Sequence, residues 1–238
     1  MKVIGFGEII WDVYPEESVI GGAMLNFCSH MAHLGDTVCL LSAIGQDGLG
    51  KAALDELKRH GVMTGFVQKN KKDTGRCIVT LDENKKPTFN VLTDTSYDNI
   101  RADVPVIEKI RGFGADLFVF NTLIQRSPVS RKALKTILDK VSFPEIFCDI
   151  NIRQGCYDRE SLLLCMEKAT VVKISDDEGH FLLDLGIIEP YDPADLPRAV
   201  AEKFRNIRAV IYTRGAEGSE VFDAKSGETF RSGRPEQV

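Results

Sequence analysis

The sequence has six cysteines but no C-x-x-C pair, and it also has no apolar run long enough to cross a bilayer. The cysteine spacing predicts neither a zinc site nor a disulfide framework, and reduced thiols are typical of a cytoplasmic protein. The opening residues do not resemble a signal peptide. The net charge of -5 disfavours nucleic acids and anionic membranes. We therefore expect a cytoplasmic protein with no nucleic-acid or membrane partner.

Two nucleotide-binding patterns are also absent. No G-x-G-x-x-G follows the first predicted strand, which argues against a nicotinamide-dependent oxidoreductase, and no Walker-type P-loop is present. The glycines of residues 112–116 imitate a phosphate loop, but they precede a predicted strand instead of opening a helix. We interpret them as a connection.

Buried strands and amphipathic helices alternate along the chain. A length of 238 residues fits one large domain, or one domain with a small appendage. Apolar runs predict strands, and between them helical periodicity predicts helices, such as the one at residues 49–59. This alternation is typical of an α/β fold with a mostly parallel sheet. The strands are expected at residues 3–7, 38–44, 66–68, 116–120, 145–151, 171–175 and 209–213.

A helix with a glycine entrance is predicted after residue 22. Gly21 and Gly22 carry no Cβ, so a ligand could lie against the backbone, where the N–H groups of the first helical turn are exposed. Asn26, about one turn in, could donate to and accept from a hydroxyl. Gly35 is placed to end the helix. The alternative is a tight turn before an ordinary core helix, whose apolar face comprises Met24, Phe27, Cys28, Met31 and Leu34.

Polar residues follow two of the predicted strands. Asp12 lies just beyond the first strand and could accept hydrogen bonds from two neighbouring hydroxyls of a ligand, or it could be a solvated turn acid. Alternation along an extended segment would place Asp149, Asn151 and Arg153 on one side. Arg153 suits a phosphoryl or carboxylate group, although an Asp–Arg salt bridge that fixes a loop is the alternative.

Two motifs together resemble the N-terminal signature of the ribokinase-like (PfkB) family of carbohydrate kinases. They are GGxxxNxxxxxxxLG at residues 21–35 and IGxDxxG at residues 44–50. The residues at 7–15 and D-x-N-x-R at 149–153 resemble the fructokinase-like branch. The resemblance implies one ribokinase-like domain over residues 1–238, a three-layer α/β/α fold around a mostly parallel sheet. It also implies a small β-sheet lid, formed by insertions at about 11–20 and 74–98, that covers the sugar and could pair two subunits in a homodimer.

The lid insertion at 74–98 contains a predicted hairpin. Its strands are expected at residues 74–82 and 87–92, joined by a polar turn at 82–86. The resemblance also implies the reaction, which is ATP-dependent phosphorylation of a sugar's primary hydroxyl with ATP and Mg²⁺. The sugar would be a ketose such as fructose, or a keto-sugar acid. The implied sugar-binding residues are Asp12, Gly21, Gly22, Asn26 and Arg153, and the implied nucleotide-binding residues are Lys173, Asp176, Thr213, Gly215 and Gly218.

The family's catalytic element, D-T-x-G-A-G-D, is not found in this sequence. It carries the base aspartate and the anion-binding helix N-terminus, and the resemblance places it shortly after Val238. We therefore expect no catalytic residue within these 238 residues and a domain that lacks its C-terminal part, and the resemblance identifies no metal ligand. A non-catalytic sugar-binding or regulatory relative remains the alternative.

Overall fold

The chain divides into two structural units in the computed structural model, which describes residues 1–81, 87–190, 192 and 195–233. Unit 1 comprises residues 1–120 and 124–144, and unit 2 comprises residues 121–123 and 145–238. Within the described ranges, every helix is too short or too polar to cross a membrane.

The sheet of unit 1 is centred on the first strand of the chain. β1 (Lys2–Phe6) pairs in parallel with β4 (Thr37–Leu41) on one side and with β9 (Leu117–Asn121) on the other. The side chains of Val3, Ile4 and Phe6 are fully buried. A strand covered on both faces needs apolar residues at successive positions, which explains its unbroken hydrophobic run.

Helix α1 (Ala23–His33) packs so closely on β1 that two positions of the strand region must lack a side chain. A Cβ at Gly5 would lie 2.3 Å from the Cys28 sulfur, and one at Gly7 would lie 2.7 Å from the Met24 Cβ. The expectation that Leu34 belongs to the helix face is wrong, because Leu34 lies past the helix end and is 80% exposed. Leu25, which the predicted face did not include, is buried.

Polar caps begin the other helices of unit 1. The Asp47 side chain accepts from the Gly50 N–H at the start of α2 (Gly48–Arg59), and Asp103 accepts from the Val106 N–H at the start of α3 (Val104–Phe113). Ser127 caps α4 (Pro128–Lys140) in the same way. The remaining short elements are β5 (Ala43–Ile44), η1 (Thr64–Phe66), β6 (Gln68–Lys69), η2 (Ser96–Asn99) and η3 (Leu123–Arg126), the last with its first residue in unit 2. The strand expected at 66–68 is therefore wrong in its bounds, because Phe66 ends η1 and β6 begins at Gln68.

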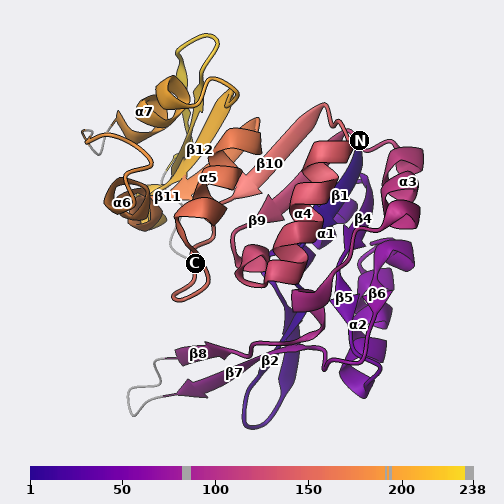
Figure 1. Ribbon diagram of the computed structural model, residues 1–238. Coiled ribbons are helices and arrows are strands. Elements are labelled where there is room, and N and C mark those ends of the chain that lie inside the picture. Colours follow the sequence, from indigo (N-terminus) through magenta and orange to yellow (C-terminus); the bar gives the residue numbers. More distant parts are fainter. Residues whose placement is uncertain (82–86, 191, 193–194, 234–238) are drawn as a thin grey trace. The chain divides into compact units, whose positions relative to one another are not determined.

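A second, four-stranded sheet in unit 1 combines the two predicted lid insertions, and we call it the lid sheet (Figure 1). β2 pairs with β3 and β7 pairs with β8, both antiparallel, and the central strands β2 and β7 pair in parallel. The predicted hairpin is therefore confirmed, while its turn at 82–86 lies outside the described residues. The strands are β2 (Ile10–Val13), β3 (Ser18–Gly21), β7 (Gly75–Leu81) and β8 (Pro87–Val91).

Unit 2 contains a five-strand run with the order β14-β13-β12-β11-β10. β10, β11 and β12 pair in parallel, and β13 and β14 extend the sheet from β12 with antiparallel pairing. The alternation of helices with parallel strands in both units confirms the predicted α/β class. The elements are β10 (Glu145–Asp149), α5 (Arg159–Lys168), β11 (Val171–Ser175), α6 (Asp176–Asp184), α7 (Leu196–Lys203), β12 (Ala209–Thr213), η5 (Gly215–Glu217), β13 (Ser219–Asp223) and β14 (Thr229–Arg231).

Candidate functional site

The glycine entrance to α1 is built around a buried carboxylate. Gly22 is the N-cap residue, with φ 104° and ψ 129°, and a Cβ there would lie 2.9 Å from the Glu8 carbonyl oxygen. Glu8 is fully buried, and its Oε1 accepts from the Met24 N–H at 3.3 Å. The close packing of Gly22 against the Glu8 backbone is by itself enough to require glycine at this position. Contact between Gly22 and a sugar therefore remains a prediction.

Asp12 lies in the lid sheet and not in a turn. It occupies β2, where it pairs with Val19 of β3 and with Cys77 of β7, so the turn-acid alternative is wrong. A Cβ at Gly21 would lie 3.0 Å from Asp12 Oδ2, which means that the glycine makes room for the carboxylate. Burial raises the pKa of Asp12, and a hydrogen bond from the Cys77 thiol opposes that rise.

Asn26 lies in the same part of unit 1. Its backbone N–H donates to the Gly22 carbonyl at 2.9 Å, and the residue is exposed on the first turn of α1. Four predicted sugar-side residues, Asp12, Gly21, Gly22 and Asn26, thus belong to one connected region: the end of β2–β3 and the beginning of α1.

The polar residues after β10 depart from the expected geometry. Asn151 has φ 42°, so the segment leaves the extended conformation and the alternation argument for Asp149, Asn151 and Arg153 is wrong. Asn151 is 7% exposed, whereas Arg153 is exposed and donates from Nη1 to the Ile152 carbonyl at 3.0 Å. Thr122 Oγ1 donates to the carbonyls of this turn, at Ile150 and Asn151.

Lys173 of β11 lies between two carboxylates, that of Asp149 at the end of β10 and that of Glu178 in the first turn of α6. Its ammonium lies 3.2 Å from Asp149 Oδ1 and 3.6 Å from Glu178 Oε2. Burial raises the pKa of Asp149, and the Lys173 charge opposes that shift. Asp149 therefore pairs with Lys173, a partner that differs from the arginine expected for a loop-fixing salt bridge.

Glu178 also joins the backbone of two loops. Its Oε1 accepts from the Ile152 N–H at 3.0 Å, and its Oε2 accepts from the Ser175 N–H at 2.8 Å. Together with Ser175 it forms a capping box at the start of α6. Asp176, the predicted residue of this turn, is exposed, and its carboxylate accepts from the Asp177 N–H. Its nucleotide role remains a prediction.

The predicted nucleotide loop follows β12. Thr213 ends the strand opposite Ser175 of β11, and the chain then turns through Gly215 at φ 49° and Gly218 at φ 94°. Arg214 N–H donates to the Gly218 carbonyl at 2.9 Å, which closes the turn. A Cβ at Gly218 would lie 3.0 Å from the Gly233 carbonyl oxygen, whereas Gly215 faces open space. Gly215 is thus the position at which a ligand could approach the backbone.

Sequence reasoning did not select two buried acids of these regions, Glu8 and Glu178, as site residues. Glu178 has a local signal, because Ser175 and Glu178 have the S-x-x-E spacing of a capping box. Glu8 has no comparable signal, because its partner Met24 lies 16 positions away. Within the described part of the chain, no cluster of three or more His, Cys, Asp or Glu side chains could hold a metal ion.

A family model described as pfkB family carbohydrate kinase matches residues 7–238. A putative sugar kinase of Pyrococcus horikoshii is 29% identical over 189 residues, covering 74% of this chain and 58% of the relative. Fructokinase-2 of Oryza sativa subsp. japonica is 24% identical over 241 residues, covering 92% of this chain and 69% of the relative. The chain thus spans little more than half the length of the archaeal relative.

Solved structures share the fold. The crystal structure of a sugar kinase from Pyrococcus horikoshii in complex with ATP superimposes with a TM-score of 0.78 at 20% sequence identity. The alignment covers 99% of this chain and 78% of that chain. At this identity the likeness supports the α/β architecture and leaves the bound ligands to be argued from the residues themselves.

Proposed function

Because the chain belongs to the pfkB family of carbohydrate kinases, we propose that the protein transfers a phosphoryl group from ATP to a primary hydroxyl of a sugar. The proposed acceptor is a ketose such as fructose, or a keto-sugar acid. ATP supplies the phosphoryl group, and the chain's own residues bind and orient the two substrates.

The observation that carries the proposal is the setting of Asp12. A half-buried carboxylate lies on a small sheet, beside a glycine that makes room for it and close in sequence to a helix entrance without side chains. Two carboxylate oxygens can accept hydrogen bonds from two neighbouring hydroxyls of a sugar. In this proposal Asp12 and Asn26 orient the sugar, and the lid sheet reduces the access of water to it.

Arg153 supports a ketose or keto-acid over a nucleoside. Its guanidinium is exposed. Burial raises the pKa of the Asp149 carboxyl, and the positive charge of Arg153 partly opposes this rise. A planar, permanently charged group of this kind suits an anionic or strongly polar partner better than a purine.

On the nucleotide side, we propose that Lys173, Thr213 and the glycines at 215 and 218 bind ATP. Mg²⁺ is usually held by one or two carboxylates together with phosphate oxygens. Asp149 and Glu178, whose carboxylates lie within 4 Å of Lys173, supply carboxylates of this kind, and the exposed Asp176 lies on the same helix turn.

The test is a kinase assay on the complete natural protein with ATP, Mg²⁺ and a panel of fructose, keto-deoxygluconate and adenosine. We expect ADP formation with one of the first two and little with adenosine. Calorimetric titration of the same preparation separates turnover from binding: sugar binding without turnover would favour the non-catalytic relative. Faster phosphorylation of adenosine would refute the assignment of a ketose or keto-acid.

We further propose a homodimer through the lid sheet, in a cytoplasmic protein. Exposed apolar side chains support the dimer: Val19 on β3 is 46% exposed and Phe89 on β8 is 56% exposed, and both strands are edges of that sheet. The cysteines Cys28, Cys39, Cys77, Cys148, Cys156 and Cys165 are all free thiols, which fits a reducing compartment. Light scattering of wild type and Phe89→Asp tests the dimer, which the substitution should weaken.

A further inference from the structure

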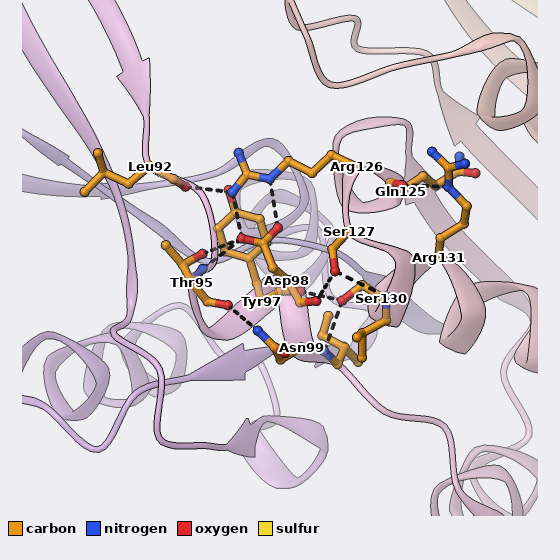
Figure 2. Close-up of polar contacts among 12 residues, drawn as sticks. Leu92, Thr95, Tyr97, Asp98, Asn99, Gln125, Arg126, Ser127, Ser130 and Arg131 are labelled. Atoms are coloured by element: carbon orange, nitrogen blue, oxygen red, sulfur yellow. Dashed lines mark hydrogen bonds and ion pairs between the residues drawn. The ribbon is translucent and has the colours of Figure 1, made fainter.

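The lid sheet is held to the rest of unit 1 by a buried polar cluster that the proposed reaction does not use. After β8 the chain runs through residues 92–100 and meets the start of α4 (Figure 2). Asp98 and Arg126 form an ion pair there, with side chains only 6% and 7% exposed. Charged residues are rarely buried to this extent unless they are paired, so loss of either partner would leave an uncompensated buried charge.

Arg126 bonds this segment at three points. Its Nε donates to Asp98 Oδ1 at 2.8 Å, and its Nη2 donates both to Asp98 Oδ2 at 2.9 Å and to the Leu92 carbonyl at 2.7 Å. Its guanidinium also lies over the Tyr97 ring, 4.9 Å from the ring centre. Leu92 is the first residue after β8, so Arg126 fixes the point at which the hairpin returns from the lid sheet.

The same segment is bonded on its other sides. Asp98 Oδ2 accepts from the Thr95 N–H and hydroxyl, and the Ser127 hydroxyl donates to the Asp98 carbonyl. Ser130 Oγ donates to the Tyr97 carbonyl at 2.7 Å and accepts from the Ile100 N–H. Figure 2 shows these groups converging on Asp98 from the chain that leaves the lid sheet and from the start of α4.

Tyr97 carries the connection to the sugar-side strand. The residue is fully buried, and a Cβ at Gly75 would lie 2.6 Å from its Cε1, so the ring packs directly on the first residue of β7. Gly75 pairs with Ile10 of β2, and two positions further along the same pair of strands Asp12 pairs with Cys77. A packed and hydrogen-bonded path thus runs from Arg126 through Tyr97 to the strand that carries Asp12.

We infer that Arg126 is a positioning residue for sugar binding: it holds the lid sheet, and with it Asp12, in the arrangement that receives the sugar. This inference rests on the proposed function for its ligand. A lysine at this position keeps the charge but cannot make the two parallel bonds to Asp98 together with the bond to Leu92. The planar guanidinium is therefore the feature on which lid placement depends.

Two variants test the role. Arg126→Lys removes the bidentate geometry, and the double variant Arg126→Met with Asp98→Asn removes the ion pair without leaving a buried charge unpaired. Arg131→Met is the matched control, because Arg131 lies on α4, donates to the Gln125 carbonyl and points away from the Asp98 cluster in Figure 2. All four proteins are titrated with the sugar that the wild type binds and, separately, with ATP.

We expect both Arg126 variants to bind the sugar about 3- to 30-fold more weakly, with ATP affinity unchanged within about twofold. Hydrogen exchange without ligand should show faster exchange at β7 and β8 in these variants and not in Arg131→Met. Equal sugar affinity in folded variants, or equal losses for sugar and ATP, would overturn the inference. Absence of sugar binding by the wild type would refute the proposed function instead, and unaltered exchange at β7 and β8 would still refute the positioning role.

Discussion

Replacing Gly22 by alanine tests how the entrance of α1 is built. A Cβ at this position would lie 2.9 Å from the Glu8 backbone oxygen and 3.2 Å from the Glu8 Cγ, and the residue has φ 104°. A side chain in this backbone region costs of order 1–3 kcal/mol. Overpacking against a backbone atom that cannot move freely costs about 1–3 kcal/mol more. We therefore expect Gly22→Ala to lose roughly 2–6 kcal/mol of the free energy of unfolding.

Two other glycines separate these contributions. Gly35 has φ 95° with no atom within 4 Å of an added Cβ, so Gly35→Ala should lose only the backbone cost of about 1–3 kcal/mol. Gly48, the first residue of α2, also faces open space but has no positive φ, and Gly48→Ala should be stabilising by about 0.5–1 kcal/mol.

Denaturant unfolding followed by tryptophan fluorescence measures these differences in unfolding free energy within unit 1, which contains all three glycines. The single tryptophan, Trp11, lies in β2 of unit 1, is 8% exposed and donates from Nε1 to the Leu49 carbonyl. Gly22→Ala should be less stable than Gly35→Ala by about 1–3 kcal/mol. Equal unfolding midpoints for the two variants would refute the argument that Glu8 leaves no room beside position 22.

Three further predictions concern acidic residues and their partners. Asp12→Ala should weaken sugar binding roughly 10- to 100-fold with little change in ATP affinity, because about 1.5–3 kcal/mol of charge-assisted hydrogen bonding is lost; equal calorimetric sugar affinities for variant and wild type would contradict it. Asp47→Ala should destabilise the protein more than Asp103→Ala, which costs about 1 kcal/mol, because Asp47 caps α2 and also accepts from the Thr74 N–H and hydroxyl. Burial raises the pKa of Asp47, but these hydrogen bonds outweigh burial and leave the pKa lowered. The extra loss of stability should therefore be present at pH 7 and vanish as the solution is acidified below the unfolded pKa of about 3.9. Lys173→Met should destabilise the protein increasingly as the pH rises above about 4. Burial already raises the folded-state pKa of Asp149, and the Lys173 ammonium is the charge that opposes this rise. The same loss of unfolding free energy in urea at pH 4 and pH 8 would show that Lys173 does not stabilise the ionised Asp149.

The alternation of strands and helices could be predicted because it depends on local patterns. β11 and β12 begin and end where their apolar runs do, and α2 begins one residue before the helix predicted at 49–59 and ends at the same residue. Gly35 has the left-handed conformation that its position after the helix predicted.

What could not be predicted depends on non-local contacts or on a single dihedral angle. The strand β2 was not predicted, and its parallel pairing with β7 joins segments far apart in the chain, which no local pattern shows. The positive φ of Asn151 breaks an alternation that a sequence pattern assumes throughout. Glu8 and Arg126 are buried, and no local spacing identifies their partners, the Met24 N–H and Asp98.

The central place of β1 in its sheet has a consequence for the order of events during protein synthesis. β1 is made first, and β4 can pair with it early, but its other edge waits for β9, where Leu117 pairs with Val3. At translation rates of about 5–20 residues per second, residue 117 follows residue 3 by roughly 6–23 s. During that interval the nascent chain presents the unpaired edge of an apolar, five-residue strand, which is a template for aggregation. Chaperone contact during translation should therefore matter more for this unit than its final stability suggests.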